Sequence, residues 1–491
     1  MRQSGEDRHV QDRASAQDRR GPGEEPGKVM SMISGLDSRV IDANSEALGI
    51  PVSTLMDNAG KVVSSFLIEH YPQSRILFVC GPGNNGGDGF AAALLMDPSM
   101  VTVALLKKSN TIHSEISKQR YSKLQCRVEE YNSSLLNEAD VIVDCALGTG
   151  IRGKVKDPYR SFILEANASG LPIVSVDVPS GLGSDVTIVP RTTITFHDVK
   201  TGMNDDNCGN ILVADVGIPV DAMKFIGPGD VLRYPVPDEN SHKGENGRLM
   251  IIAGGPYYGA AVMCSLSALR TGADIVRLYT PENVASIAAT YSPVLMITPL
   301  PGNHLTTESV DMLLAESMNY DAVLIGPGIG KDPDTMLAVK EFVRKCKTPM
   351  VVDADALSAI IGMEISTPTI LTPHKGEFRK LDSQYGGPEP LAQLMNVTLL
   401  VKGHVDTITN GNATRYNRSG TAAMTGAGTG DVLSGAVAAL LSKGLSSMEA
   451  ASLGAFLSGK AGEYAFKDKS YGLVATDIIE EIPHVLRDNL R

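Results

Sequence analysis

The sequence predicts an α/β protein of at least two domains, the first of them doubly wound, with helices on both faces of a parallel sheet. Three observations lead to this prediction. At 491 residues the chain is too long for one ordinary core and suits two domains or three. Short apolar runs alternate along it with longer amphipathic stretches. Several apolar runs end in glycine-rich segments, as strands of α/β sheets do beside a ligand.

The composition is that of a globular protein with an acidic surface. Hydrophobic residues make up 43% of the chain and charged residues 20%, and the formal net charge is -12. This charge argues against a dedicated surface for nucleic acid or for an anionic membrane, although a local basic patch is compatible with it. We therefore expect small-molecule partners, with anionic ligands held by glycine-rich turns and helix N-termini.

The cysteines and the N-terminal residues predict the cellular compartment of the protein. The six cysteines form no CxxC pair and no metal-binding spacing, so we expect buried thiols in a reducing, cytoplasmic compartment. No apolar run approaches the roughly 18 residues of a membrane span. Residues 1–29 are polar and charged, without the apolar core of a signal peptide. We expect them to be a disordered tail, or to precede a true start at Met30.

The first domain is expected over residues 30–225. Residues 38–50 have helical spacing and end near a glycine. Four β-rich runs that are apolar on both faces predict parallel strands covered by helices on both sides, in a Rossmann-like domain. These runs are 76–80, 101–106, 141–147 and 172–178.

The second domain is expected over residues 230–491. Proline and glycine accumulate over 217–237, which makes this segment the best candidate boundary. A second α/β series follows and closes with a small-residue segment at 421–444. Its strands are predicted at 248–254, 274–280, 322–328, 350–357, 369–373 and 398–403. The glycine motifs of the two halves differ in kind and in order, so the halves are different domains and not duplicates.

The most distinctive motif of the first half is GNNGGDG at 83–89, between a strand and an alanine-rich helix. We expect a loop whose backbone N–H groups approach an anion, assisted by the N-terminus of the following helix. A GxGxxG-like pattern alone is weak evidence, and a tight turn is the structural alternative. A turn needs only one or two glycines, so the Asn-Asn-Gly-Gly-Asp run favours a binding site.

Two aspartates end strands at the same expected edge of the sheet. Asp144 precedes a second small-residue loop at 148–150, and Asp177 precedes the turn with Ser180. Either aspartate alone could merely cap the next turn. Because the carboxyl ends of parallel strands share one edge, the two carboxylates and the two glycine segments together predict one pocket.

In this order GNNGGDG, DCALGTGIRG and DVPSG resemble the NAD(P)H-hydrate epimerase domain, the YjeF N-terminal family, over roughly residues 30–225. The resemblance implies that Asp177 is the acid/base that helps to open and re-close C6 of the hydrated nicotinamide ring. It implies a potassium ion held by Asn85, Asp144 and Ser180. The hydrated nucleotide would contact Asn84, Asn85, Gly86, Gly87, Asp88, Gly148, Thr149, Gly150, Ile151, Arg152, Gly153, Lys154 and Asp177. In the family the second loop often has an aromatic-rich form followed by a lysine. This chain has Ile-Arg-Gly there instead, which leaves open whether Arg152 or Lys154 assists.

The strongest motif of the second half is TGAGTGDVLSG at 425–435. Its glycines precede Asp431 and an apolar helix, so backbone amides at the helix start can stabilise a transferring phosphoryl group. An aspartate there is placed to remove a proton from the acceptor hydroxyl. The structural alternative is a glycine-rich helix entry with a favourable first-turn carboxylate.

GTGD before a C-terminal helix resembles the ribokinase-like superfamily. With KGENGRLMIIAGG, GPGxG, DADAL, TPHxGE and VKG, the second half resembles the ADP/ATP-dependent NAD(P)H-hydrate dehydratases over roughly 230–491. The resemblance implies that Asp431 activates the C6 hydroxyl for phosphorylation, after which phosphate leaves. The hydrate would contact Ala261, Gly328, His374 and Asp431. The adenine nucleotide, accompanied by magnesium, would contact Lys402, Gly403, His404, Val405, Asp406 and Gly430.

Other functions of the two halves are compatible with the sequence. The second half could be a vitamin or sugar kinase, because Gly430-Asp431 is common to ribokinase-like kinases, and the first could be a non-catalytic binding module. His374 could be structural, although its place beside charged residues favours substrate contact. The sequence does not separate ADP from ATP, or hydrated NADH (NADHX) from hydrated NADPH (NADPHX). The resemblance favours a homo-oligomer.

Overall fold

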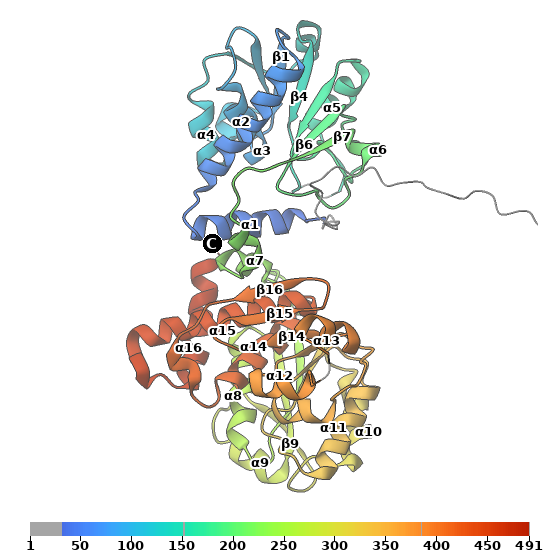
Figure 1. The fold of residues 1–491 in the computed structure, drawn as a ribbon, viewed down its shortest axis with the longest axis vertical. Helices are drawn as coiled ribbons and strands as arrows, with labels where there is room; N and C mark the ends of the chain where they lie inside the picture. The colour runs from blue at the N-terminus through green and yellow to red at the C-terminus, as the bar shows by residue number, and fades with distance from the viewer. Residues whose placement is uncertain (1–31, 151–152, 384, 491) are drawn as a thin grey trace, which may run out of the picture.

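The computed structural model describes residues 32–150, 153–383 and 385–490. The expectations for residues 1–29, Ile151 and Arg152 lie outside the described residues. The described chain forms two lobes, each built on one β-sheet with helices on both faces (Figure 1), which confirms the predicted α/β class. Among the described helices, none is long and apolar enough to cross a membrane.

Seven parallel strands form the sheet of the first lobe, in the order β3-β2-β1-β4-β5-β6-β7. They are β1 (Ile76–Cys80), β2 (Val101–Leu105), β3 (Arg127–Glu130), β4 (Val141–Cys145), β5 (Ile173–Val176), β6 (Thr192–Phe196) and β7 (Asn210–Ala214). The chain runs outward from β1 to β3 and then returns to place β4 on the other side of β1. Such a reversal leaves a crevice outside the carboxyl ends of the strands, here between β1 and β4.

Helices cover both faces of this sheet because successive residues of its strands enter two different cores. Phe78 of β1 packs in a core with Leu67 and Phe90, whereas its neighbour Val79 packs in a core with Phe162. The helices of the lobe are α2 (Val52–His70), α3 (Asn84–Ala93), α4 (Glu115–Tyr121), α5 (Tyr159–Ala168) and the short α6 (Asp205–Cys208). Helices α2 and α3 lie on the first face and α5 on the second, which is the doubly wound arrangement.

Nine strands form the sheet of the second lobe, in the order β10-β9-β8-β11-β12-β13-β14-β15-β16. They are β8 (Arg248–Ile252), β9 (Ile275–Pro281), β10 (Met296–Leu300), β11 (Ala322–Ile325), β12 (Met350–Val352), β13 (Thr369–Leu371), β14 (Thr398–Val401), β15 (Asp406–Thr409) and β16 (Thr414–Asn417). Neighbours are parallel as far as β14, and β15 and β16 are antiparallel. The sequence analysis did not identify this last hairpin, although Asn410-Gly411 in its loop is typical of one.

The helices of the second lobe also divide between two cores. Helices α8 (Tyr258–Arg270), α14 (Thr429–Ser442), α15 (Ser447–Lys469) and α16 (Ala475–Asn489) pack on one face. Helices α10 (Val310–Ser317), α11 (Pro333–Lys345), α12 (Lys375–Leu381) and α13 (Pro388–Met395) pack on the other. Helix α9 (Glu282–Ala288) follows β9.

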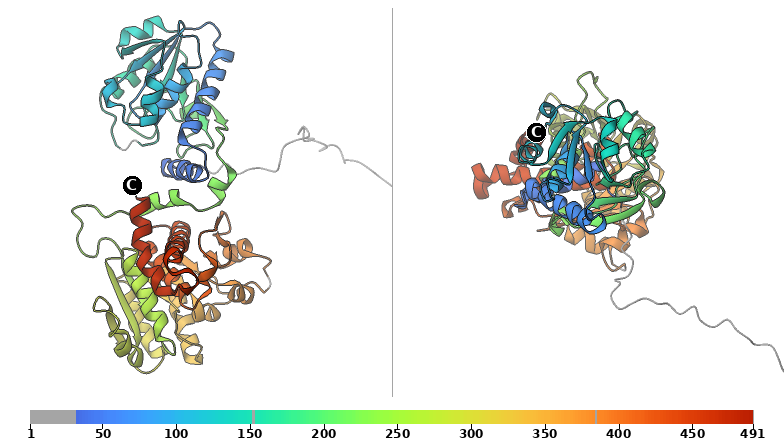
Figure 2. Two further views of the ribbon diagram at one scale, coloured as in Figure 1. Left: turned by 90° about the vertical axis from the view of Figure 1, so that its left-hand side faces the viewer. Right: turned by 90° about the horizontal axis from the view of Figure 1, so that it is seen from above.

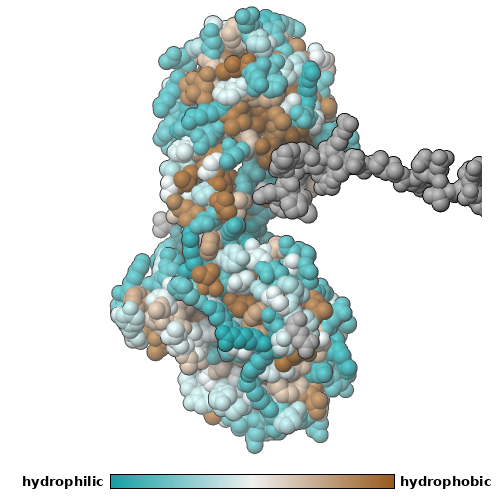
Figure 3. Space-filling model, viewed as in Figure 1, coloured by the Kyte–Doolittle hydropathy of each residue, from teal (hydrophilic) through white to brown (hydrophobic). Residues whose placement is uncertain are grey.

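Three short segments lie between the lobes: α1 (Gly35–Ala47), α7 (Val220–Lys224) and the 3-10 helix η3 (Pro228–Arg233). Both side views place α1 across the junction (Figure 1, Figure 2). Helix α1 falls within the segment expected for the first domain, yet it packs mainly against η3 and α7. On the face drawn in Figure 3, hydrophobic residues are more frequent over the first lobe and the junction than over the second lobe.

Candidate active sites

The first site begins where β1 passes into α3, beside the crevice. Helix α3 starts at Asn84, so the run Asn84–Asp88 forms the first turns of the helix, and the prediction of a loop there was wrong. The glycines serve close packing: a Cβ on Gly86 would lie 2.0 Å from the carbonyl oxygen of Gly81. The helix start is therefore seated directly on the strand end, with the positive end of its dipole at the crevice.

A buried polar cluster joins the expected potassium ligands. Asp144 is fully buried in β4 and accepts hydrogen bonds from Ser180 N (2.8 Å), Ser180 Oγ (2.5 Å) and Ser175 Oγ (2.9 Å). Burial raises the pKa of Asp144, and these hydrogen bonds oppose the rise. Asn85 Nδ2 donates to Leu147 O (3.0 Å), and Leu147 N donates to Ser180 Oγ (2.8 Å). The other amide atom, Asn85 Oδ1, is buried and has no hydrogen-bond partner among the described residues.

Next to this cluster Asp177 forms an ion pair with a lysine that the sequence analysis missed. Lys200 Nζ lies 2.5 Å from Asp177 Oδ1 and also donates to Phe196 O (2.6 Å) and Thr195 Oγ1 (3.0 Å). The Lys200 side chain is 4% exposed, whereas that of Asp177 is 21% exposed. Asp177 has a φ of +63°, a conformation that non-glycine residues rarely adopt. The carboxylate is thus held at the strand end by an unusual backbone turn and an almost completely buried cation.

Two further carboxylates interact with this ion pair. Burial and the charge of Asp177 raise the pKa of Asp42 to about 6, and the charge of Lys200 opposes the rise. Burial, with the charges of Asp177 and Asp42, raises the pKa of Asp88 well above its ordinary value. Asp88 was a predicted contact residue, and Asp42, on α1, was not. Three carboxylates around one ammonium group form a cluster that can both hold and release protons.

The second small-residue loop, which begins at Gly148, lies only partly at this site. A Cβ on Gly148 would lie 3.7 Å from Asn85 Cβ, and one on Gly35 of α1 would lie 2.5 Å from Thr149 Oγ1. Gly148 and Thr149 therefore line the site beside α1. Open space surrounds Gly150 and Gly153, and Lys154 is exposed. Contacts of residues 150–154 with a nucleotide remain predictions.

The second site is centred on the start of α14. Thr429 is the first residue of the helix, and Asp431 stands in its first turn. The N-cap, Gly428, has a φ of +91°, and a Cβ there would lie 2.5 Å from Met263 Sδ. Only glycine satisfies both the left-handed backbone and this close approach. The sequence thereby leaves the first amides of α14 uncovered by side chains next to Asp431.

A buried aspartate and a lysine stand beside Asp431. Asp353, at the end of β12, is 1% exposed, and its Oδ1 lies 3.0 Å from Lys402 Nζ. A Cβ on Gly430 would lie 3.3 Å from the same ammonium group, which places Lys402 at the helix start. Burial and the charge of Asp353 raise the pKa of Asp431 to about 7, and the charge of Lys402 opposes the rise. Asp353 is the first residue of the DADAL motif, and the sequence analysis assigned it no contact.

The segment Lys402–Asp406, predicted to bind the nucleotide, forms the exposed turn between β14 and β15. Gly403, His404 and Val405 are exposed. Asp406 stabilises the turn from within: its Oδ1 accepts from Gly403 N (2.9 Å) and its Oδ2 from Asn417 Nδ2 (2.9 Å). The backbone of the turn therefore faces solvent next to Lys402, while the Asp406 side chain is already bonded.

The residues predicted to contact the hydrate, apart from Asp431, lie in different surroundings. Ala261 is fully buried in α8, and a Cβ on Gly328 would lie 2.3 Å from Tyr257 O, just before α8. His374 is the N-cap of α12: its Nδ1 accepts from Gly376 N (2.9 Å) and Glu377 N (3.2 Å). The ring thus has a structural role, and substrate contact by His374 remains a prediction. The backbone of His374 forms a β-bridge with Lys402, so the cap lies near the site.

Two buried hydroxyls of the second lobe lack hydrogen-bond partners among the described residues. They are Thr280 Oγ1 at the end of β9 and Thr372 Oγ1 just after β13, both on the carboxyl side of the sheet. A Cβ on Gly254, at the end of β8, would lie 2.5 Å from Thr280 Oγ1. The described ranges contain no group of three or more His, Cys, Asp or Glu side chains arranged to hold a metal ion.

Two protein-family models match the chain in separate regions. The model for the N-terminus of YjeF-related proteins matches residues 52–202, and the model for NAD(P)H-hydrate dehydratase matches residues 249–484. The first region contains the Asp177 site and the second contains the Asp431 site.

Curated relatives match almost the whole chain. The bifunctional NAD(P)H-hydrate repair enzyme Nnr of Pyrobaculum aerophilum is 37% identical over 494 residues, which cover 93% of this chain and 98% of that protein. The enzyme of the same name from Methanothermobacter thermautotrophicus is 37% identical and covers 94% of this chain and 97% of that protein. A solved ADP/ATP-dependent NAD(P)H-hydrate dehydratase from Bacillus subtilis, co-crystallised with ATP and Mg²⁺, is 24% identical, covers 54% of this chain and 98% of its own, and has a TM-score of 0.47.

Proposed function

The chain belongs to the family of bifunctional NAD(P)H-hydrate repair enzymes, and from this we propose that it repairs hydrated NADH and NADPH in two steps. It interconverts the R and S forms of the hydrate, and it dehydrates the S form to NAD(P)H at the expense of ADP or ATP. We assign epimerisation to residues 30–225 and dehydration to residues 230–491. The observation that carries the proposal is Asp431 in the first turn of α14, beside Lys402 and uncovered helix amides.

Epimerisation is an acid–base problem that the Asp177 cluster suits. C6 of the hydrate carries a hydroxyl group and the ring nitrogen. Removal of the hydroxyl proton lets the C6–N bond break to an aldehyde, and re-closure from the other face with return of a proton inverts C6. Asp177 moves this proton, and Lys200, 2.5 Å away, orients its carboxylate. Asp88, in the same cluster, has a pKa that burial and the charges of Asp177 and Asp42 raise well above its ordinary value.

Dehydration proceeds through a phosphate ester. Asp431 takes the proton of the C6 hydroxyl as the hydroxyl oxygen attacks the terminal phosphoryl group of the nucleotide. The phosphoanhydride bond to that group breaks, which releases AMP from ADP or ADP from ATP. The amides at the start of α14 and the Lys402 ammonium stabilise the charge of the transferred group. The lone pair of the ring nitrogen then expels phosphate from C6, and loss of a proton from C5 restores the double bond. Phosphorylation is needed because hydroxide is a poor leaving group and phosphate a good one.

The residues expected to hold potassium fit a hard monovalent cation. Asn85 Oδ1 is a buried oxygen without a hydrogen-bond partner among the described residues. Asp144 is a fully buried carboxylate, and none of the described cationic side chains pairs with it. Oxygens of Asn85, Asp144 and Ser180 would hold the ion, which supplies the positive charge that a buried carboxylate requires.

For the nucleotide we propose the turn Lys402–Asp406 and Gly430, with magnesium bound through the phosphates. The turn exposes backbone next to the Lys402 ammonium, and Mg²⁺ in kinase sites is held largely by substrate phosphates. Ala261, Gly328 and His374 remain the proposed contacts to the hydrate. We further propose that the protein forms a homo-oligomer and that it is cytoplasmic. Its six cysteines are free, which agrees with a reducing compartment.

The test of the function is recovery of the near-ultraviolet absorbance of the reduced nicotinamide ring. Hydrated NADH, prepared as separate R and S forms, is mixed with the enzyme and either ADP or ATP. We expect recovery with one nucleotide or both, immediately from the S form and after epimerisation from the R form. No recovery from either form with either nucleotide contradicts the proposal. A stable phosphorylated product without elimination indicates a kinase instead.

The pH dependence of dehydration follows from the environment of Asp431. As a general base it acts only when ionised, and its pKa is raised to about 7. We therefore expect kcat/KM for dehydration to fall about tenfold per pH unit below that pKa and to level off above it. Lys402→Met removes the charge that opposes the rise, so any remaining activity should have its midpoint at higher pH. A flat profile between about pH 5.5 and 8.5 rules out Asp431 as the titrating base.

A further inference from the structure

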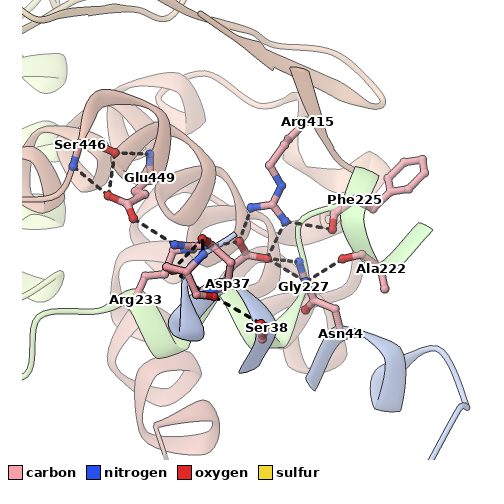
Figure 4. A network of polar contacts seen from close by, with 12 residues as sticks. Asp37, Ser38, Asn44, Ala222, Phe225, Gly227, Arg233, Arg415, Ser446 and Glu449 are labelled. Carbon is pink, nitrogen blue, oxygen red and sulfur yellow. Dashed lines mark hydrogen bonds and ion pairs between the residues drawn. The ribbon is translucent and has the colours of Figure 1, made fainter. Parts of the chain in front are cut away.

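Helix α1 is anchored on the second lobe by a buried polar network (Figure 4). Asn44 of α1 is 3% exposed; its Oδ1 accepts from Gly229 N (2.8 Å) and its Nδ2 donates to Asp230 Oδ2 (3.1 Å). Asp230 is fully buried and forms an ion pair with Arg415 of β16, with 3.0 Å between Nη2 and Oδ2. The Asn44 amide of α1 is therefore satisfied by η3 and α7, and η3 is in turn paired with a strand of the second sheet.

A second ion-pair chain fixes the start of the same helix. Arg233 of η3 pairs with Asp37 in the first turn of α1 and, through Nη1, with Glu449 of α15 (3.0 Å). The Arg233 side chain is 12% exposed. Val40, between the two anchors, is 2% exposed. One flank of α1, from Asp37 to Asn44, is thus bound to η3, which is itself paired with α15 and β16 of the second lobe.

Other residues of the α1 segment reach the first site. Ile33, just before α1, pairs with the backbone on either side of Lys200: Ile33 N donates to Val199 O (3.0 Å), and Thr201 N donates to Ile33 O (2.9 Å). Gly35 lies against Thr149, in the second loop. Asp42, in the third turn, interacts electrostatically with Asp177, Asp88 and Lys200. Among the described residues the Asp42 carboxylate has no hydrogen-bond or ion-pair partner.

We infer that Asp42 is a positioning residue of the first site, carried there by α1 and kept in place by the second lobe. The inference rests on the proposed epimerisation and adds to it. The family resemblance placed the first site wholly within one domain's motifs. The geometry instead makes that site a composite of the carboxyl edge of the first sheet and a helix anchored on the other lobe.

The role of Asp42 follows from the charges in the cluster. Asp42 and Asp88 both interact with the charges of Asp177 and Lys200, and the charge of Asp42 helps to raise the pKa of Asp88. Opening and re-closure of C6 need a proton to leave and return within one turnover. Loss of the Asp42 charge lowers the pKa of Asp88 and strengthens the attraction between Lys200 and Asp177. Both effects slow the proton transfers without removing a nucleotide contact.

The first test is Asp42→Asn in the full chain, with Glu46→Gln as the matched control. Glu46 is an exposed carboxylate one turn further along the same helix. R-to-S conversion is followed by chromatography without ADP or ATP, and the rate without enzyme is subtracted. We expect Asp42→Asn to lower the epimerisation kcat about tenfold or more, with KM and dehydration within about twofold of wild type. Glu46→Gln should behave as wild type.

The second test loosens the anchors. We expect Asn44→Ala to lower the epimerisation kcat at least about threefold without lowering the dehydration rate, because α1 then holds Asp42 less firmly. Arg233→Met repeats the test from the other anchor if Asn44→Ala does not fold. Arg418→Met is the control, since the exposed ion pair of Arg418 with Asp221 lies at the junction and includes no residue of α1.

The outcomes separate this inference from the proposed function. If the wild-type protein does not epimerise the hydrate, the proposed function fails. If it does, and Asp42→Asn epimerises at the wild-type rate with a melting temperature within about 3 °C, the role of Asp42 is overturned. Wild-type epimerisation by a folded anchor variant overturns the claim that the second lobe keeps Asp42 in place.

Discussion

Replacing Asp431 with asparagine is expected to slow dehydration by about 10²–10⁴-fold and to leave epimerisation at the wild-type rate. Asparagine has the same shape but cannot accept the proton of the C6 hydroxyl. The start of α14 tolerates the change, because Asp431 caps no backbone amide of its own helix. The loss is measured as the initial rate of NADH recovery from the S form with saturating nucleotide.

A matched control separates general-base catalysis from the effect of a charge at a helix start. Asp477 occupies the same third position in α16, where its Oδ2 accepts from Val474 N (2.8 Å). Asp477→Asn should cost about 1 kcal/mol of stability and leave both activities unchanged at 25 °C. If Asp431→Asn removed epimerisation as well as dehydration, the assignment of the two activities to separate sites would be wrong.

Replacing Asp177 with asparagine is expected to reverse this pattern. Epimerisation should fall by about 10²–10⁴-fold, because the group that moves the hydroxyl proton is lost. Asparagine accommodates the left-handed backbone at position 177 better than other non-glycine residues, so the fold should persist. With a mixture of R and S forms, the variant should recover the absorbance of the S form at the normal rate and then stop.

Asp185→Asn is the control for Asp177→Asn. Asp185 pairs with Arg160 on the surface of the same lobe (2.6 Å). The Asp185→Asn variant should give full recovery of the absorbance from both the R and the S form. Complete recovery by Asp177→Asn at the wild-type rate contradicts the role of Asp177. It leaves open a binding role for the first lobe, which the sequence also allowed.

Features that depend on local pattern could be predicted from the sequence. Apolar runs on both faces predicted the strands, and Asp144 and Asp177 were identified because they follow such runs directly. The error at Asn84–Asp88 has a local cause: its glycines suggested a loop, but they allow a helix to sit against Gly81. For His374 the sequence left a structural role open beside substrate contact, and Glu377, three residues on, has the spacing of the capping box that the structure contains.

The site residues that the sequence analysis missed are positioned by contacts between segments that are distant in the sequence. Lys200 follows a strand and has no distinctive motif, and only the fold brings it to Asp177. Asp42 stands in an ordinary amphipathic helix, and its position depends on η3 of the other half. Asp353 stands in the DADAL motif, but its pairing with Lys402 spans 49 residues. Periodicity and spacing contain no information on such pairings.

The anchoring of α1 also dictates an order of assembly during protein synthesis. Asn44 leaves the ribosome early, but Asp230 follows 186 residues later, and Arg415 a further 185 residues after that. The first sheet can form as soon as its strands are made. The network that anchors α1 is complete only when the end of the second sheet has emerged, so the part of the protein made first has its catalytic cluster fixed last.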